Sequence, residues 1–484
     1  MPSVDERPVA EGGGGWDARP MLAAERGGFI DRHDLWTQAQ YAAAAQARRV
    51  IDELGLELVR FSFADQHGVL HGKTLTRAAV PAAFRSGVTA PSSLLLKDSS
   101  GRSALPVFTA DAAKGFAGAG DVVLVPDPTT FRVLPWASKT GWVLCDLRFP
   151  DGSAVPYCTR SLLRGQLDRL ADAGYDLTVG VELEFHVFRG EEAAVSRGSQ
   201  LLHEEGLDRV DDLVQLLQRG LQRLDLPLRS IELEFGPSQL EITLSATGAA
   251  AAADHVTLTR SAIRQLCQRA GYHATFMSRP AGTATASTGW HLHQSLLERE
   301  TGRAAFDPGP DEELMSSTAR HWLGGLLAHA PAAAAFTTPT VNGYKRYLPF
   351  SLAPDRVLWG ADNKGAMVRV VGGGSDTGAR LENRSGEPAA NPYLYIASQI
   401  VSGLDGLARG TDPGPPTENP YAAEATLLPR SLGEAVTALA QDPAFADALG
   451  PDVVDWYSRI KRDEFARYLA HVSDWEQREY FDLF

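Results

Sequence analysis

Two short segments of the sequence place pairs of glutamates at alternate positions between apolar residues. The first reads VELEF, residues 181–185, and the second reads IELEF, residues 231–235. Successive side chains of a β-strand point to opposite faces, so each segment predicts a strand with one apolar face and one acidic face. An acidic face that meets only solvent would make these ordinary amphipathic strands. The rest of the sequence has to decide between that interpretation and a binding site.

The second acidic segment runs into a predicted turn and then into a further strand. Residues 236–238, GPS, supply turn residues, and alternation restarts with QLEI at residues 239–242. On such a hairpin we expect Glu234 and Glu241 to face each other. Converging carboxylates repel and become protonated unless a cation neutralises them, and oxygen-rich sites favour Mg²⁺ or Mn²⁺. The acidic strands therefore indicate a divalent metal site.

Two histidines in HLHQS, residues 291–295, are spaced in the same alternating way. His291 and His293 would share one face of a strand. A single buried histidine is more often a core residue than a ligand, but the nearby carboxylates favour a ligand role. One imidazole added to carboxylates is compatible with Mg²⁺ or Mn²⁺, whereas catalytic zinc usually has two or three histidines at helical spacing.

Basic residues follow in two segments, YKRYLPFSLAPDRVLWGADNKGAMVRV at 344–370 and ARLENRSGEPAANPY at 379–393. In the second, Arg380, Glu382 and Arg384 alternate along one predicted strand. Arginine forks bind phosphates and carboxylates in a fixed geometry, although a surface ladder of ion pairs shows the same pattern. Together with the metal site, they indicate phosphoryl transfer from a nucleotide. The sequence contains neither a GxxxxGK[ST] loop nor the protein kinase motifs, so another nucleotide-binding fold is required.

Composition limits the remaining alternatives. The 484 residues are 44% hydrophobic, enough for a large core and two or three domains. The net charge of -14 argues against nucleic-acid and anionic membrane surfaces and leaves small molecules and protein partners as expected ligands. Three widely spaced cysteines, with no signal peptide pattern and no apolar run of eighteen residues, predict a cytoplasmic protein without a membrane span.

Local patterns divide the chain into three parts. Residues 1–36 are predicted to be a flexible arm, residues 37–150 a helix followed by a small sheet domain, and residues 151–484 a larger domain in which helices and strands alternate. Thr159 and Asn391 are expected helix caps. The expected helices lie at residues 37–54, 159–173, 207–224, 249–270, 391–409, 431–449 and 456–471, with a linker at 410–420.

In their order along the chain, these motifs resemble the glutamine synthetase family. The similar segments run from LVRFSFADQHGVLHGK through VGVELEF, EFGPSQLEI, HLHQS and NGYKR to ENRSGEPAANPYL, and they cover roughly residues 45–484. The resemblance implies an α+β fold with a small N-terminal β-grasp domain and a large catalytic domain, whose curved antiparallel sheet is surrounded by helices. It also implies ATP, two or three Mg²⁺ or Mn²⁺ ions, and a homo-oligomer, often a dodecamer of two hexameric rings, with active sites between neighbouring subunits.

The same resemblance assigns roles to individual residues. One metal ion would be held by Glu184, Glu234 and Glu241, and another by Glu182, His291 and Glu382. The residues expected to contact ATP are His293, Gln294, Ser295, Arg369 and Arg380. Arg346 and Arg384 are expected to bind the amino-acid substrate, and Arg380 and Arg384 to stabilise the transferring phosphoryl group.

Four departures from the family pattern carry information about the substrate. Leu352 stands where glutamine synthetases have a flap glutamate that takes a proton from ammonium, and a leucine cannot bind a cation or accept a proton. Ala286 and Ser287 replace an Asn-Gly pair that contacts glutamate. Lys364 replaces an arginine near the phosphate. This substitution keeps the positive charge and loses the two-pronged hydrogen bonding of a guanidinium group. Thr377 replaces a lysine near ATP.

The resulting hypothesis is an ATP-dependent ligase that joins a carboxylate to an amine through an acyl phosphate. Arg346 and Arg384 favour the γ-carboxylate of glutamate as the acid. A buried Leu352 would favour an amine larger than ammonia with an apolar body, as in γ-glutamyl-amine or polyamine ligases. Asp98 is a further candidate on the amine side, although capping its own loop is the more common role of such an aspartate.

Three alternatives stay open at this point. One is a true glutamine synthetase with a rearranged ammonium site, and another is a ligase for an acid other than glutamate. The third is a structural homologue without turnover, which is disfavoured because all six expected metal ligands are present.

Overall fold

The computed structural model describes residues 27–109, 113, 115–190, 193–198, 200–281, 286–309, 314–348, 350–372 and 378–484. Most of the arm expected at residues 1–36 lies outside the described residues. The remainder is folded, in contrast to that expectation: α2 (Phe29–Arg32) is a short helix with buried Phe29, and the buried Trp36 donates a hydrogen bond to the Pro126 carbonyl at 2.8 Å.

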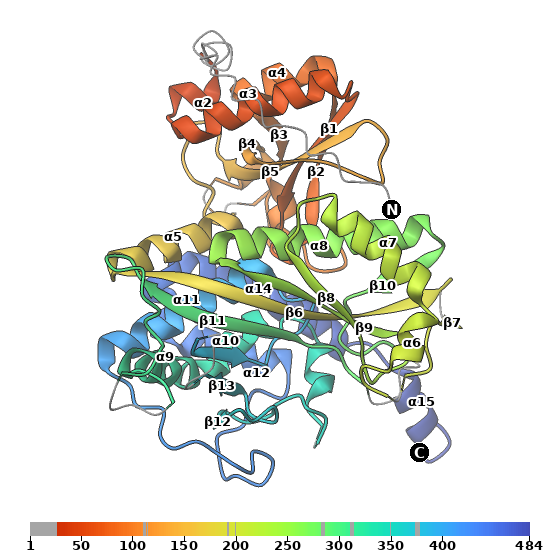
Figure 1. Cartoon of the computed structure of the whole chain (residues 1–484), viewed down its shortest axis with the longest axis vertical. Helices are drawn as coiled ribbons and strands as arrows, with labels where there is room; N and C mark the ends of the chain where they lie inside the picture. The colour runs from red at the N-terminus through yellow and green to blue at the C-terminus, as the bar shows by residue number, and fades with distance from the viewer. Residues whose placement is uncertain are drawn as a thin grey trace, which may run out of the picture.

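A five-stranded mixed sheet forms the N-terminal part of the fold (Figure 1). Only β1 and β5 run parallel within it, and α3 (Gln38–Glu53) and α4 (Val80–Ser86) cover it. The Thr37 capping box at the start of α3 agrees with the helix predicted at residues 37–54. In spatial order the strands are β2 (Leu70–Thr76), β1 (Leu58–Ala64), β5 (Thr140–Arg148), β4 (Asp121–Val133) and β3 (Val88–Pro91).

A larger, nine-stranded sheet forms the second part. Its neighbouring strands are antiparallel except for β12 and β13, so the expected antiparallel sheet has one parallel pair at its edge. The order is β12 (Trp359–Ala361), β13 (Val368–Val371), β14 (Arg380–Asn383), β11 (Trp290–Glu298), β6 (Tyr175–Arg189), β9 (Gln239–Gly248) and β8 (Leu228–Leu233). Two short strands, β7 (Ala193–Ala194) and β10 (Tyr272–Thr275), pair with the far end of β6.

Helices surround this larger sheet, and most agree with the predicted ranges (Figure 1). Asn391 caps its helix as expected, whereas Thr159 is the first residue of its helix, which Cys158 precedes as cap. The ranges 207–224 and 431–449 each overlap two helices instead of one. The helices are α5 (Thr159–Asp172), α6 (Glu204–Asp208), α7 (Asp211–Gln222), α8 (Ala249–Arg269), α9 (Ser317–Ala328), α10 (Ala330–Thr337), α11 (Pro392–Arg409), α12 (Leu432–Gln441), α13 (Pro443–Leu449), α14 (Pro451–Leu469) and α15 (Asp474–Tyr480).

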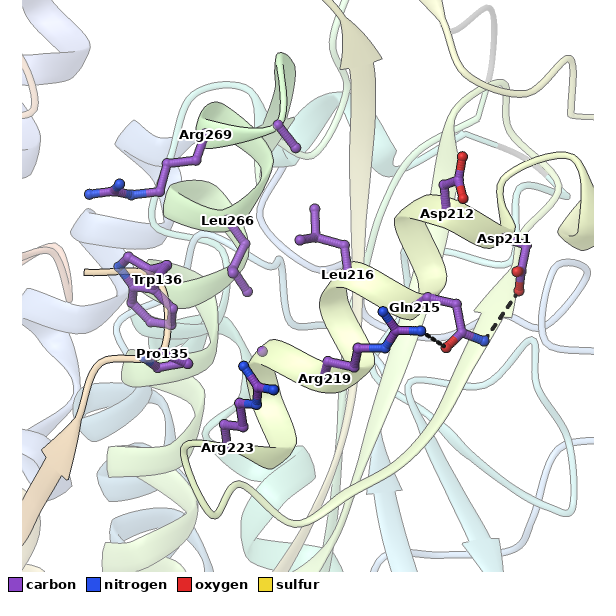
Figure 2. Close-up of a pocket in the computed structure, with 12 residues that line it drawn as sticks. Pro135, Trp136, Asp211, Asp212, Gln215, Leu216, Arg219, Arg223, Leu266 and Arg269 are labelled. Atoms are coloured by element: carbon purple, nitrogen blue, oxygen red, sulfur yellow. Dashed lines mark hydrogen bonds between the residues drawn. The ribbon is translucent and has the colours of Figure 1, made fainter. Parts of the chain in front are cut away.

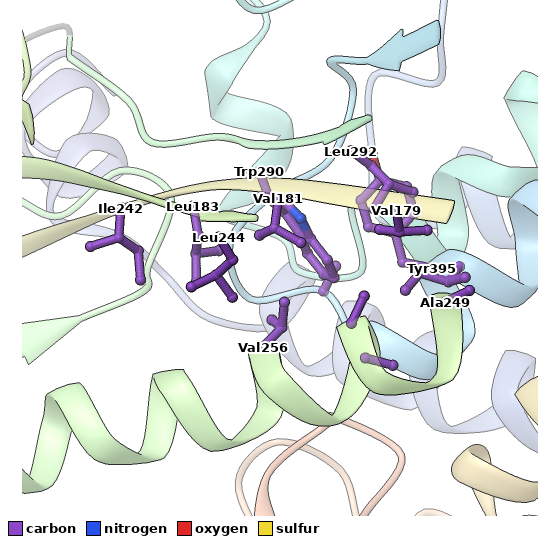
Figure 3. Close-up of a cluster of buried hydrophobic side chains, with 14 of the residues drawn as sticks. Val179, Val181, Leu183, Ile242, Leu244, Ala249, Val256, Trp290, Leu292 and Tyr395 are labelled. Atoms are coloured by element: carbon purple, nitrogen blue, oxygen red, sulfur yellow. The ribbon is translucent and has the colours of Figure 1, made fainter. Parts of the chain in front are cut away.

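One face of the larger sheet packs against α8. Val181 and Leu183 of β6 and Ile242 and Leu244 of β9 point toward Val256 of that helix (Figure 3). All five are buried, and each such side chain contributes about 1.5–3 kcal/mol by its removal from water. Because side chains alternate along a strand, this packing directs the intervening residues to the opposite face.

A buried charged cluster joins the two sheets. Arg160 of α5 pairs with Asp127 of β4 at 2.8 Å, with Asp146 of β5 at 3.1 Å and with Asp254 of α8 at 2.7 Å. Burial disfavours the ionised form of Asp127, but the charges of Arg160 and Arg164 and a hydrogen bond from Thr129 together outweigh burial and lower the pKa of this carboxyl to about 2. The guanidinium group of Arg160 therefore neutralises carboxylates from both parts of the fold.

Candidate active site

Adjacent positions on four neighbouring strands assemble an acidic cluster on the face opposite α8. Glu184 of β6 lies opposite Glu241 of β9, Glu182 of β6 lies opposite His291 of β11, and Glu382 of β14 lies opposite His293. The alternation that buries the apolar residues of these strands thus presents these residues together.

The first possible metal-binding group consists of Glu182, His291 and Glu382, as the resemblance implies. His291 Nδ1 lies 3.1 Å from Glu182 Oε2 and 3.7 Å from Glu382 Oε1. One ligand atom from each of the three residues lies within 4.8 Å of the other two.

A second group with the same spacing contains Glu184, Glu241 and His291. Glu234, which the resemblance adds to this set, is not among its members. The predicted pairing of Glu234 with Glu241 is wrong, because the register places Glu232 opposite Glu241. Glu234 instead donates its backbone N–H to the Gln239 carbonyl, at the base of the turn.

The electrostatics of the cluster show an excess of negative charge. Burial and repulsion from Glu184 raise the pKa of Glu241 to about 10, and burial and the charge of Glu234 raise the pKa of Glu184 to about 7. Burial also disfavours the Glu182 carboxylate, but hydrogen bonds with the histidines outweigh it and lower its pKa. A divalent cation would relieve this repulsion, and carboxylates with one imidazole are ligands that suit Mg²⁺ or Mn²⁺.

Three arginines stand beside the acidic cluster, and two of them, Arg346 and Arg384, are buried. Arg384 hydrogen-bonds to the fully buried Glu382, and Arg369 Nη1 donates to Glu382 Oε2 at 3.0 Å. Arg346 Nη1 donates to the Ser385 carbonyl at 2.9 Å. Within the described part of the chain, Nε of Arg346 and Nε of Arg384 are buried without a hydrogen-bond partner. Buried donors of this kind fit an anionic ligand.

Gly289 leaves room between these arginines and the metal-binding residues. A Cβ atom at this position would lie 3.0 Å from Arg346 Nη2, 3.1 Å from His291 Nε2 and 3.5 Å from Glu184 Oε1. Its backbone N–H donates to Glu184 Oε2 at 3.0 Å. Sequence reasoning missed this residue, since only its position next to the β11 histidines signalled a role.

The residues expected to contact ATP do not all share one face. His293 Nε2 lies 2.9 Å from Glu182 Oε1, and Arg380 Nε donates to His293 Nδ1 at 3.4 Å. Ser295 points to the same side. Gln294 lies on the opposite face of β11, where it accepts a hydrogen bond from the Trp322 indole at 2.8 Å. Strand alternation therefore turns the Gln294 side chain away from the face that carries His293.

The structure describes four of the five residues that depart from the family pattern. Ser287 accepts a hydrogen bond from Gln239 through its carbonyl at 3.2 Å, and Ala286 lies against the turn at Gly236. Lys364 is exposed, and Thr377 is outside the described residues. Leu352 is 44% exposed, so the expectation that it is buried is wrong. Its surroundings depend on long-range loop packing that the local sequence does not encode.

Asp98 has the loop-capping role. Its Oδ1 accepts hydrogen bonds from the backbone N–H groups of Ser100 and Arg102, both at 2.9 Å, and its Oδ2 pairs with Arg467 at 2.8 Å. These contacts satisfy the carboxylate within its own surroundings.

A hollow lies away from the acidic cluster, between Trp136, one side of α7 along its length and the last turns of α8 (Figure 2). It encloses about 880 Å³ and contains Arg219, Arg223 and Arg269. Arginines at the carboxyl ends of helices complement the helix dipole, which accounts for their position. Figure 2 also shows Arg219 bonded to Gln215.

The large sheet with its carboxylates, imidazole and buried arginines defines a carbon–nitrogen ligase of the glutamine synthetase type. A family model described as the catalytic domain of glutamine synthetase matches residues 155–480, and the chain belongs to the glutamine synthetase family.

Individual relatives extend this similarity beyond the catalytic domain. A gamma-glutamylanilide synthase from an Acinetobacter species is 43% identical over 95% of this chain and 100% of its own length. A glutamine synthetase from Halobacterium salinarum is 33% identical over 90% of this chain and 97% of its own length. The solved structure titled "Apo GmaS without ligand" superposes with a TM-score of 0.79 at 28% identity and covers 90% of this chain and 99% of its own. None of the helices described above is long and apolar enough to cross a membrane.

Proposed function

We propose that this ligase joins the γ-carboxylate of glutamate to an amine larger than ammonia, with ATP as the phosphoryl donor. The observation that carries the proposal is Leu352, an uncharged residue at the position where the family resemblance places an ammonium-binding glutamate, in a chain that keeps two groups of possible metal ligands. The similarity to a gamma-glutamylanilide synthase over 95% of the chain supports an amine other than ammonia.

The acidic cluster is proposed to hold two Mg²⁺ or Mn²⁺ ions. Glu182, His291 and Glu382 would hold one ion, and Glu184 and Glu241, helped by the nearby Glu234, would hold the other. When bound, these ions supply positive charge for the phosphates of ATP and for the transferring phosphoryl group. His293, Ser295, Arg369 and Arg380 are the proposed nucleotide contacts.

The arginines are proposed to position the acid and to stabilise charge during the reaction. Arg346 and Arg384 bind the amino-acid substrate through donors that are already buried, so little reorganisation is needed. A γ-carboxylate oxygen attacks the terminal phosphorus of ATP, and the bond to ADP breaks with its electron pair leaving on ADP. Arg380 and Arg384 stabilise this phosphoryl group, and Lys364 adds charge nearby.

The amide forms in a second step. The lone pair of the amine nitrogen attacks the acyl carbon, a carbon–nitrogen bond forms, and the carbon–oxygen bond to phosphate breaks. Phosphate leaves with the bonding electrons, and the nitrogen loses one proton to solvent. Leu352 takes no part in that proton transfer, because its side chain has no acceptor.

Phosphate release from ATP, measured with glutamate and a panel of amines, tests the proposal. We expect metal-dependent release with selected amines and a γ-glutamyl amide of the matching mass. Robust and selective use of ammonium would instead identify a true glutamine synthetase. Varying the acid distinguishes glutamate from other acids, and a lack of metal-dependent nucleotide binding in calorimetry would indicate a homologue without turnover.

We further propose that the protein is a cytoplasmic homo-oligomer, a dodecamer of two hexameric rings. Within each subunit, the boundary between the N-terminal domain and the catalytic domain is proposed to lie near residue 150. The two sheets, on either side of that residue, support the division. The C-terminal segment exposes apolar side chains, including Trp475 at 55% and Phe481 at 73%, which suits a subunit contact. Three buried free thiols suit a reducing compartment. Analytical ultracentrifugation measures the number of subunits.

A further inference from the structure

An apolar surface cluster lies near the proposed substrate arginines. It consists of Phe350, Leu352 and Tyr421, and we call it the apolar wall. Phe350 is 80% exposed, and its ring centroid lies 4.9 Å from that of Tyr421. The Tyr421 hydroxyl accepts a hydrogen bond from the Leu352 backbone N–H at 3.1 Å. Two distant segments of the chain are thereby held together by ring packing and one hydrogen bond.

The backbone of the apolar wall adopts a costly conformation. Phe350 has a φ of 59° and Leu352 a φ of 60°, both in the left-handed region. For residues with a Cβ atom this conformation costs about 1–2 kcal/mol each, and glycine would avoid that cost. Strained residues of this kind concentrate at ligand sites. These two residues combine a strained backbone with exposed apolar side chains. Binding of a ligand explains this combination better than a role as a simple loop between two secondary-structure elements.

Contacts on both sides place the apolar wall next to the active site. On one side, the Ser351 hydroxyl donates to the carbonyl of Arg346 at 3.0 Å. On the other side, Tyr421 flanks Gly365, where a Cβ atom would lie 3.2 Å from Tyr421 Cε2. The preceding residue, Lys364, is close enough for its charge to act on Glu234 of the acidic cluster. The wall thus lies between the arginine side and the acidic side of the site.

We propose that the apolar wall binds the ring of an aromatic amine in its neutral form and so selects arylamines over ammonium and alkylammonium ions. This inference rests on the proposed function. The nitrogen of an arylamine is weakly basic because its lone pair is delocalised into the ring, so it arrives uncharged at neutral pH and needs no carboxylate to bind it. The aromatic rings of Phe350 and Tyr421 suit a third ring in stacked or edge contact. An alkylammonium ion that binds to this apolar surface would lose part of its hydration shell without gaining a charged partner, which disfavours its binding.

Exchanging the wall residues tests the proposal, with aniline, methylamine and hydroxylamine as probes. Phe350→Ala is expected to lower kcat/KM for aniline at least tenfold, because the variant loses apolar contact with the ring of the substrate. The value for hydroxylamine should change little, because hydroxylamine is small and neutral and has no ring. Tyr421→Phe, which keeps the ring and loses the hydrogen bond, should give a smaller decrease. Leu352→Glu should raise the use of methylamine relative to aniline.

Phe108→Ala is the matched control, because Phe108 is 81% exposed in the N-terminal part of the chain. It should leave all three kcat/KM values unchanged, and thermal melting checks that every variant is folded. If the wild-type protein forms γ-glutamyl hydroxamate while Phe350→Ala leaves the ratio of aniline to hydroxylamine use unchanged, the inference is overturned and the proposed function stands. If the wild-type protein forms no product with any amine, both are overturned.

Discussion

Replacing Arg160 by methionine should destabilise the protein strongly, because this residue neutralises the buried carboxylates that join the two sheets. Arg164 also contacts Asp127 and Asp146 and would keep part of their compensation. Among the described residues, Asp254 would keep the hydrogen bond from the Tyr393 hydroxyl at 2.8 Å. Removing one partner of a buried ion pair costs about 3–5 kcal/mol, and the remaining contacts favour the lower end of this range. We therefore expect a loss of about 3 kcal/mol.

Differential scanning fluorimetry at a fixed scan rate measures this effect as a lower Tm. At about 2 °C per kcal/mol for a chain larger than 150 residues, the expected decrease is about 6 °C. Arg77→Met is the matched control, because Arg77 pairs with Asp52 at the surface, with side chains that are 50% and 63% exposed. Such a pair contributes at most about 1 kcal/mol. Equal changes in Tm for the two variants would refute the reasoning.

The pH dependence of the same variant separates charge from packing. Arg160 contributes to the lowered pKa of Asp127, which is about 2 in the folded protein, so its contribution to stability is present above the unfolded value of about 3.8. That contribution is lost as the pH falls toward 2. The difference in stability between wild type and Arg160→Met should therefore narrow below about pH 4, whereas a difference due to packing alone would stay constant.

Three further predictions concern metal, pH and the space within the site. Mn²⁺ at about 100 times its Kd should stabilise the protein by about 2.7 kcal/mol, and Glu241→Gln should abolish most of this gain in thermal melts. Burial lowers the pKa of His329, but its hydrogen bonds to Asp442 at 2.6 Å and Asp405 at 2.9 Å outweigh burial and raise it. The stabilisation from these two ion pairs is thus fully present below the unfolded pKa of about 6.5, and it is lost as the pH rises through the folded pKa of His329. The urea midpoint of the wild-type protein should therefore fall over that pH range, and the midpoint of His329→Asn should fall less. Gly289→Ala should lower kcat/KM more than tenfold with a small change in Tm, because the added Cβ meets Arg346 Nη2 at 3.0 Å; an unchanged kcat/KM would show that the site tolerates a side chain there.

Alternation along strands allowed the sequence to predict which residues share the acidic face. Glu182 and Glu184 lie where the VELEF pattern places them, because the apolar positions between them are fixed by the core. The partner of Glu241 could not be predicted in the same way. Glu232 and Glu234 share one face of the IELEF strand, so either satisfies the pattern, and only the turn conformation, with Ser238 at a φ of 61°, sets the register.

Other features depend on contacts between residues that are far apart in the sequence. The three partners of Arg160 come from β4, β5 and α8, and an arginine in the amphipathic pattern of α5 gives no local sign that it is buried. Tyr421 follows a segment that the sequence marks only as a linker. The assignment of Gln294 to ATP followed the family resemblance, although strand alternation within HLHQS already predicted that its side chain points away from the histidines.

The same strands carry core residues on one face and possible metal ligands on the other, so packing of the hydrophobic core also fixes the positions of these ligands. A slip of β9 by one residue along β6 would turn Ile242 and Leu244 out of the core in the same movement that turns Glu241 into it. Burial of the apolar side chains sets the strand register, and the same register places the possible ligands. Their placement therefore does not depend on a bound cation. Substitutions in the loops around the site can consequently accumulate while the relative positions of the strand carboxylates stay protected by the requirement to fold.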